Sequence, residues 1–248
     1  MRNIKLIIEY DGKDFNGWQK QPGKFNIQGE IERAIQEVTG EEVELIGSGR
    51  TDAGVHALGQ VANFKTNSTI PIDKIPYAIN SKLKRTIRIK CAEEVDERFH
   101  SRYNCKRKTY RYTIHNSVQG TALYRYMEYH IPQPLNVKKM QQAIRYFEGE
   151  HDFKAFKSTG GSAKSTIRTI YKAEIKQDGE RIQIELTGNG FLYNMVRIIV
   201  GTLLKVGMEE IQPEDIPHII ASQDRNQAGK TVPAHGLCLV KVNYEDEI

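Results

Sequence analysis

Residues 47–57 read GSGRTDAGVHA, a polar and glycine-rich stretch between two apolar runs. The run before it, 43–46, and the run after it, 60–64, are predicted to be strands, so the stretch is a connection within a sheet. A plain turn does not need the three ionisable side chains that it carries, and its glycines let the backbone approach a ligand closely. From this chemistry two interpretations stay open: a tight loop in which Asp52 is a turn residue paired with Arg50, or an active site.

The elements around this connection follow the order of a ferredoxin-like unit. Strands are predicted at 1–10 and 87–95 and helices at 26–35 and 72–83. Together with the two strands beside the connection, they give the order β-α-β-β-α-β. A four-stranded sheet with a layer of helices is also the plan of RNA-recognition domains, although this is an analogy of fold and does not establish function.

The second half of the chain repeats this outline. Its predicted elements are strands at 109–114 and 127–131, a helix at 137–147, a hairpin of 167–176 with 181–186, and a glycine-led helix over 188–201. We therefore predict an α+β protein with two ferredoxin-like or RRM-like halves and mainly antiparallel sheets. The expected division is 1–103, which carries the Asp52 connection, and 104–248.

Composition limits the classes of function. The chain has 248 residues and 36 basic against 31 acidic side chains, a net charge of +5 that permits a polyanionic partner without requiring one. Its three cysteines are widely spaced, and no Cys-x-x-Cys pair favours a disulfide framework or a zinc site. The chain opens on a strand with no signal peptide, and the apolar run 191–208 is interrupted by polar residues. These features predict a cytoplasmic protein with no metal and no membrane span.

The densest basic stretch, residues 106–112, reads KRKTYRY. Its alternation predicts a strand on which Tyr110 and Tyr112 share one face. Cations interleaved with aromatic rings suit RNA, because phosphates attract positive charge and unpaired bases stack on flat rings. The alternative is a solvated strand edge whose tyrosines belong to the core.

Arg197 lies on the otherwise apolar helix of the second half. If this arginine is buried it needs an anionic partner, for which Asp52 is the candidate. The alternative is a surface arginine whose aliphatic stem covers the helix.

Residues 49–57, together with Gln60, resemble the catalytic loop of the TruA-type tRNA pseudouridine synthases. Segments 10–21, 147–153 and 188–201 also resemble motifs of this family, and the resemblance covers the chain nearly end to end. It implies that the two sheets join into one continuous sheet flanked by helices, with an active-site cleft between the halves. It also implies a homodimer whose two subunits build the RNA cleft.

The resemblance implies an isomerase that converts uridine into pseudouridine in the anticodon stem-loop of tRNA, at about positions 38, 39 and 40, on a flipped-out nucleotide. Asp52 would be the catalytic carboxylate. Tyr110 would stack on the base, Leu237 would line its other side, and Arg50 would fill the vacated space or hold a phosphate. Either Arg50 or Arg197, if it lies nearby, would favour the charged form of Asp52. No cofactor is implied, because the reaction needs neither a redox change nor a group donor.

Two other functions would account for part of these residues. A catalytically silent RNA-binding module would use the same basic strand, but a carboxylate facing phosphates would repel its ligand. A different Asp-dependent hydrolase acting on a nucleoside would not need residues 106–112. The sequence leaves open whether Asp52 attacks C1′ of the ribose, adds to the base or abstracts a sugar proton.

Overall fold

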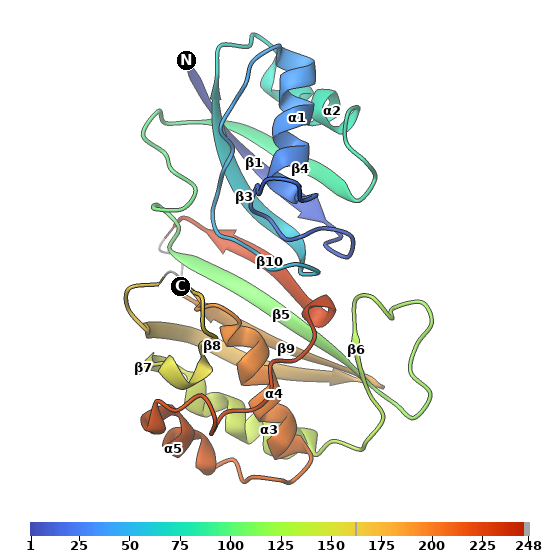
Figure 1. Ribbon diagram of the computed structural model, residues 1–248, viewed down its shortest axis with the longest axis vertical. Helices are drawn as coiled ribbons and strands as arrows, with labels where there is room; N and C mark the ends of the chain where they lie inside the picture. Colours follow the sequence, from blue (N-terminus) through green and yellow to red (C-terminus); the bar gives the residue numbers. More distant parts are fainter. Residues whose placement is uncertain (162, 246–248) are drawn as a thin grey trace. The chain divides into compact units, whose positions relative to one another are not determined.

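The computed structural model describes residues 1–161 and 163–245. The chain forms two compact units, which are described separately (Figure 1). Unit 1 comprises Met1–Lys106 together with the C-terminal segment that begins at Cys238, and unit 2 comprises Arg107–Leu237.

Unit 1 holds a sheet with helices alongside it. Its elements are β1 (Arg2–Tyr10), α1 (Ile27–Thr39), β2 (Ile46–Gly47), β3 (His56–Thr66), η1 (Ile72–Lys74), α2 (Ile75–Asn80), β4 (Ile87–Val95) and β10 (Leu237–Asn243). The strand β1 lies between β4 and β3 and is antiparallel to both, and β2 pairs antiparallel with β3. The order β4-β1-β3-β2 is that of the predicted ferredoxin-like unit, although β2 has only two residues.

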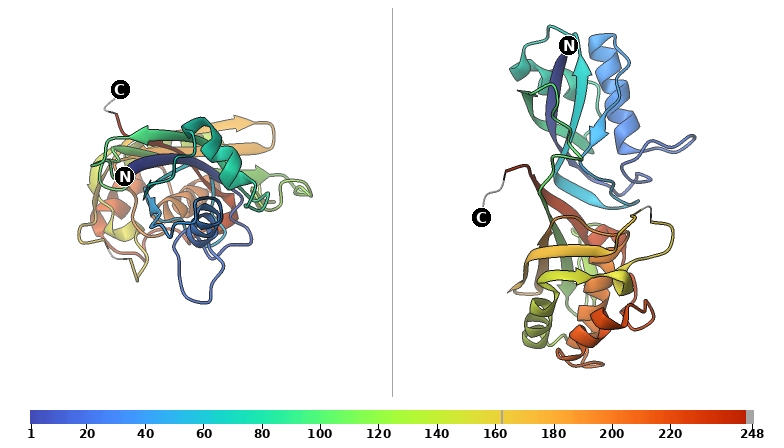
Figure 2. Two further views of the ribbon diagram at one scale, coloured as in Figure 1. Left: turned by 90° about the horizontal axis from the view of Figure 1, so that it is seen from above. Right: turned by 90° about the vertical axis from the view of Figure 1, so that its left-hand side faces the viewer.

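The core of unit 1 follows from the alternation along β1. Ile4, Leu6 and Ile8 are fully buried, as are Ile27 and Ile31 on α1. Figure 2 shows α1 lying along one face of the sheet, and α1 also contacts α2. The helix begins at the N-cap Asn26, whose Oδ1 accepts a hydrogen bond of 2.8 Å from the Gly29 N–H, and it ends at Gly40 in the left-handed conformation.

Unit 2 is built around a run of mainly antiparallel strands. Its elements are β5 (Arg107–Asn116), β6 (Tyr129–Ile131), α3 (Val137–Ile144), η2 (Arg145–Phe147), β7 (Gly149–Asp152), η3 (Lys154–Phe156), β8 (Ile167–Asp178), β9 (Arg181–Gly188), α4 (Met195–Gly207), α5 (Asp215–Ser222) and η4 (Ala234–Gly236). The strand order is β5-β9-β8-β7, and the short β6 pairs in parallel with β5. The apolar helix α4 is almost entirely buried and packs against α3.

One close contact fixes the chain after α5 against α4. A Cβ on Gly201 would lie 1.8 Å from the Lys230 carbonyl oxygen, so only glycine lets the segment around Lys230 pass there. The Thr202 hydroxyl oxygen accepts a hydrogen bond of 2.8 Å from the Gly229 N–H. Segment 229–232 therefore has a fixed position along α4, which matters for the site below.

The α+β class and its mainly antiparallel strands are confirmed. The last strand, β10, pairs in parallel with β3, where Cys238 lies opposite His56. As a division of the chain, 1–103 and 104–248 stays a prediction. Within residues 1–161 and 163–245, no helix is both long and apolar enough to cross a lipid bilayer. The same residues contain no group of three His, Cys, Asp or Glu side chains placed to hold a metal ion.

Candidate active site

The Asp52 connection begins directly after β2, and a buried glutamine holds its first residues by hydrogen bonds. Gln60, on β3, has no exposed surface. Its side-chain oxygen accepts a hydrogen bond of 2.7 Å from the Ser48 hydroxyl, and its amide nitrogen donates one of 3.0 Å to the Gly49 carbonyl. The Ser48 N–H also donates to the Val61 carbonyl at 2.7 Å. The start of the loop is therefore fixed to the sheet.

The middle of the loop is held by the segment that follows β1. Thr51 Oγ1 and the Tyr10 hydroxyl share a buried hydrogen bond of 2.7 Å, and the Thr51 carbonyl accepts one of 3.0 Å from the Trp18 N–H. Gly17 permits this approach, since it has φ +85° and a Cβ there would lie 2.5 Å from the Thr51 carbonyl oxygen. Burial raises the pKa of the Tyr10 hydroxyl, so this group stays protonated at neutral pH.

Trp18 belongs to the core of the loop and is only 3% exposed. Its indole ring lies against Gly47, where a Cβ would be 2.5 Å from the indole nitrogen. This contact explains why β2 ends in glycine. Trp18 therefore packs against the residues on which the Asp52 loop rests, and almost none of its surface is accessible to a nucleotide.

The far end of the loop is a tight turn against Gly12. The Val55 N–H donates to the Asp52 carbonyl at 3.1 Å, and Gly54 has φ +79°. A Cβ on Gly12 would lie 1.9 Å from the Val55 carbonyl oxygen, and the Gly12 N–H donates to Nδ1 of His56 at 3.1 Å. Asp52 thus lies at the start of a turn whose other end is fixed by backbone contact.

The residues around Asp52 alternate in exposure. Thr51 is buried, Asp52 is half-buried and Arg50 is exposed. The buried threonine anchors the backbone, while the side chains on either side of it remain accessible to a ligand. A carboxylate held in this way on a fixed backbone loses little conformational entropy when it acts on a bound substrate.

Tyr110 lies on β5 opposite Leu186 of β9 and is 8% exposed. Its ring meets that of Phe191 edge to face, with 5.2 Å between centroids and an angle of 84° between planes. Tyr112, on the same face of the strand, is fully buried, and burial raises the pKa of its hydroxyl. Tyr112 is therefore a core residue, and Tyr110 is also largely buried but keeps a small exposed fraction.

Arg197 is half-buried on α4 and is oriented by two neutral acceptors. Its Nε donates to the Val232 carbonyl at 2.7 Å, and one terminal nitrogen donates to Oδ1 of Asn194 at 2.8 Å. Asn194 adopts the left-handed conformation with φ 61°, and its amide nitrogen donates to the Ser158 hydroxyl at 3.0 Å. The guanidinium is therefore positioned by the residue that begins the helix.

Leu237, 6% exposed, is held in place through Tyr112. The Tyr112 hydroxyl donates to the Pro233 carbonyl at 2.8 Å, and a Cβ on Gly236 would lie 2.6 Å from the Tyr112 ring. Together with the bond from Arg197 to Val232, these contacts fix the segment that leads to Leu237. In unit 2, Arg197 and Tyr112 therefore both contact the segment that leads to Leu237. Tyr112 lies two positions after Tyr110 on β5. Unit 1 carries Arg50 and Asp52.

A family model described as tRNA pseudouridine synthase matches residues 6–104 and 143–245. The matched residues include Arg50, Asp52, Arg197 and Leu237, whereas Tyr110 lies between the two matched segments. The chain belongs to the tRNA pseudouridine synthase family.

Relatives within this family are similar along their full length. A tRNA pseudouridine synthase A from Acetivibrio thermocellus is 54% identical over 244 residues, which is 98% of this chain and 100% of the relative. One from Caldicellulosiruptor bescii is 56% identical over the same shares, and the tRNA pseudouridine synthase A 2 of Clostridium perfringens is 54% identical. The protein is therefore an isomerase that acts on tRNA. Among solved structures, a chain titled as part of a Cbf5-Nop10-Gar1 complex matches 97% of this chain and 59% of its own length, with a TM-score of 0.38 and 13% identity.

The residues that position the candidate side chains of this synthase have little signal in the sequence. Gln60 reads only as part of the motif, and Asn194 reads only as a polar residue within the apolar run 191–208. A left-handed Asn at a helix start has no sequence signal beyond the tolerance of Asn for that conformation. Tyr10 reads as an ordinary strand residue, and its bond to Thr51 depends on a contact distant in sequence.

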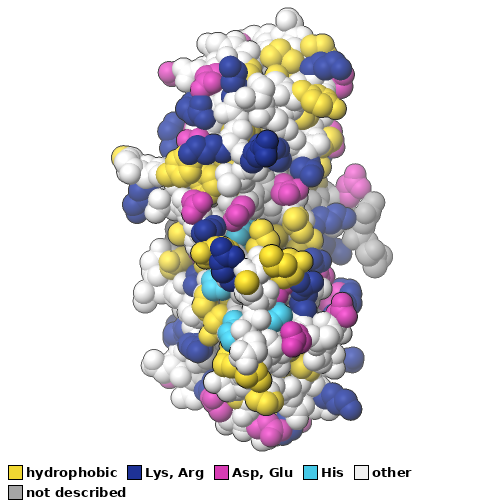
Figure 3. Space-filling view, turned by 90° about the vertical axis from the view of Figure 1, so that its right-hand side faces the viewer, with side chains coloured by type: hydrophobic (Ala, Val, Ile, Leu, Met, Phe, Trp, Pro, Cys, Tyr) yellow, Lys and Arg dark blue, Asp and Glu magenta, His cyan; other side chains and the backbone are white. Residues whose placement is uncertain are grey.

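A second missed feature of the synthase is the exposed segment between β5 and β6. The guanidinium of Arg125 lies 4.4 Å from the ring centroid of Tyr126, and that of Arg181 lies 4.8 Å from the ring centroid of Tyr124. Both tyrosines and the neighbouring Leu123 are exposed. Figure 3 shows a face on which hydrophobic, basic and histidine side chains gather. Exposed rings beside cations are suited to contacts with nucleic acid.

Proposed function

We propose that this protein converts uridine into pseudouridine in the anticodon stem-loop of tRNA, at about positions 38, 39 and 40, on a nucleotide flipped out of the stem. Asp52 is the catalytic carboxylate. The observation that carries this proposal is the half-buried Asp52 on a loop fixed by the hydrogen bonds of Gln60, Tyr10 and Trp18.

The reaction is an isomerisation, so the product has the same composition as the uridine. The bond from N1 of the base to C1′ of the ribose breaks, the base turns, and its C5 bonds to C1′. The proton leaves C5, and N1 gains one. One carboxylate at a fixed position can act on the sugar carbon, on the base or on a sugar proton, and each of these routes uses Asp52 in its charged form.

The other four residues act on the same nucleotide. Tyr110 stacks on the base and Leu237 contacts its other side, which keeps water from the intermediate. Arg50, exposed beside Asp52, fills the space that the base leaves or holds a phosphate. Arg197, oriented by Asn194 and Val232, favours the ionised carboxylate. The chain works as a homodimer in the cytoplasm, where unmodified tRNA is its substrate.

The proposal is tested with purified protein and unmodified tRNA transcripts. After incubation, pseudouridines are labelled with a carbodiimide adduct and mapped by reverse-transcription stops. We expect stops at about positions 38, 39 and 40 of the anticodon stem and at no other uridine. Stops confined to another arm of the tRNA would contradict the assigned site while leaving the reaction type intact.

A second expectation concerns Tyr110. Tyr110→Ala removes the ring and should lower kcat/KM by about ten- to a hundredfold, because stacking of one base on an aromatic side chain contributes about 1–3 kcal/mol. Tyr110→Phe retains the ring and should keep most of the affinity for tRNA. Single-turnover kinetics on transcripts, with thermal unfolding of each variant as the control for folding, measures both effects. Wild-type kinetics in a folded Tyr110→Ala protein would exclude the stacking role.

A further inference from the structure

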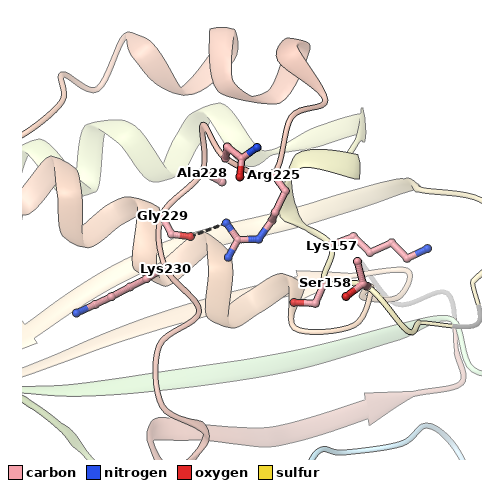
Figure 4. A pocket seen from close by; sticks show the side chains of 8 residues that line it. Lys157, Ser158, Arg225, Ala228, Gly229 and Lys230 are labelled. Atoms are coloured by element: carbon pink, nitrogen blue, oxygen red, sulfur yellow. Dashed lines mark hydrogen bonds between the residues drawn. The ribbon is translucent and has the colours of Figure 1, made fainter.

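Unit 2 has a hollow of about 500 Å³ that the proposed reaction does not use. It lies between the segment after η3 and the segment after α5 (Figure 4). The lining residues are Lys157, Ser158, Thr159, Arg225, Asn226, Ala228, Gly229 and Lys230.

The lining is strongly basic. It contains three cations and no acidic side chain. Arg225 is half-buried, and two of the five N–H donors of a guanidinium have partners among the described residues: the Gly229 carbonyl at 2.9 Å and the Thr231 hydroxyl at 3.2 Å. Both acceptors are neutral. They hold the guanidinium in place without cancelling its charge, so its remaining donors are available to an anion.

The cations are spread out and do not converge on a single point. In Figure 4 the Arg225 guanidinium lies between the two lysines, whose side chains extend away from it in opposite directions. Ser158 lies on the same side of the hollow as Lys157, and Thr159 also lines the hollow. A compact anion such as free phosphate would meet one cation at a time. A polyanion with successive charges would meet all three.

We propose that this hollow binds the sugar–phosphate backbone of the RNA substrate, away from the nucleotide that reacts. The proposal rests on the proposed function for the identity of its ligand. An RNA strand supplies regularly spaced phosphates for Lys157, Arg225 and Lys230, and its ribose hydroxyl groups can bond to the short hydroxyl side chains.

The hollow is also connected to a candidate residue for the reaction. Ser158 lines it, and the hydroxyl of Ser158 accepts the hydrogen bond from Asn194. Asn194 in turn accepts from Arg197. Two hydrogen bonds therefore join the hollow to the Arg197 guanidinium, so RNA bound in the hollow contacts the same rigid group of residues that orients Arg197.

The test uses the double variant Lys157→Gln/Lys230→Gln in the full-length protein, with affinity for unmodified tRNA measured by filter binding over a range of salt concentrations. Losing two phosphate contacts should weaken binding by about tenfold and reduce the slope of log K against log salt by about 1.4–1.8, depending on whether the bound strand is single or paired. The matched control is Lys82→Gln/Lys138→Gln, two exposed lysines outside the hollow with the same change in net charge. The control should stay within about twofold of wild type.

An unchanged dissociation constant and an unchanged salt slope for the first variant would overturn the proposal. An equal loss in the control variant would also overturn it, because the effect would then reflect net charge alone. Calorimetric titration with inorganic phosphate tests whether the hollow binds a small anion instead of RNA. Tight phosphate binding that the lysine substitutions abolish, with tRNA affinity unchanged, would identify a small-anion site instead. Failure of the wild-type protein to form pseudouridine would contradict the proposed function. The binding measurements test independently whether the hollow binds RNA.

Discussion

Asp52→Ala protein should form no detectable pseudouridine while binding tRNA within about tenfold of the unsubstituted protein, since phosphate contacts dominate affinity. The backbone of the loop is fixed through Gln60, Thr51 and Gly12, so removing the carboxylate leaves the turn in place. The loss therefore reports on the chemistry of one side chain. It is measured by release of tritium from 5-tritiated uridine in tRNA, because forming the new bond displaces the hydrogen at C5.

Two further substitutions make this result specific. Asp52→Asn keeps the size of the side chain and removes its charge, so it should be as inactive as Asp52→Ala. Asp178→Asn, at an exposed position on the β8–β9 hairpin, makes the same chemical change elsewhere and should retain full turnover. Substantial turnover by both Asp52 variants would remove Asp52 from the mechanism. It would favour a role for the chain in binding RNA alone.

The second large effect is expected from a residue that bears no functional group. Gly12→Ala places a methyl group 1.9 Å from the Val55 carbonyl oxygen, where the neighbouring atoms are all backbone. The Val55 N–H bonds to the Asp52 carbonyl, so a shift at Val55 is transmitted to the turn that carries the carboxylate. A displacement of about 1 Å in a catalytic group costs about a hundredfold in rate, and we expect kcat to fall by at least that factor.

The substitution should also lower the free energy of unfolding by about 1–3 kcal/mol, as overpacking does. Single-turnover kinetics and thermal unfolding separate the two effects, since a folded protein with low kcat and near-normal tRNA affinity is the expected combination. Gly190→Ala is the control, because its added Cβ would have no neighbour nearer than 3.7 Å. Normal kcat in the Gly12→Ala protein would show that the Asp52 turn does not depend on this contact.

The sequence predicted the elements with strong local signals. The alternation in residues 1–10 and the amphipathic pattern after Asn26 correspond to β1 and α1, and the loop between two strands at Asp52 was also predicted. The helix predicted over 72–83 is shorter, because the chain forms a 3-10 turn at Ile72–Lys74 and an α-helix only at Ile75–Asn80. The local pattern of apolar residues indicates that a helix is present, but it does not determine where a short helix begins or ends.

The remaining features depend on contacts distant in sequence. The parallel pairing of β10 with β3 joins Cys238 to His56, and no local pattern at either residue specifies a partner so far away. The candidate side chains were found through their chemistry and through the resemblance of their motifs. The groups that orient them are the buried amide of Gln60, the left-handed Asn194 and the hydroxyl of Tyr112. They were not found, because each acts through a bond made only in the folded chain.

The pairing of β10 with β3 has a consequence during protein synthesis. A ribosome releases the segment of β3 long before the residues of β10, so the nascent chain carries an incomplete first sheet while almost the whole of unit 2 is being made. During that interval the backbone groups of His56 and Ala57 lack the strand that later pairs with them, at the very end of β3 that adjoins the Asp52 loop. The Asp52 loop of the nascent chain therefore reaches its final support only after translation has passed residue 237.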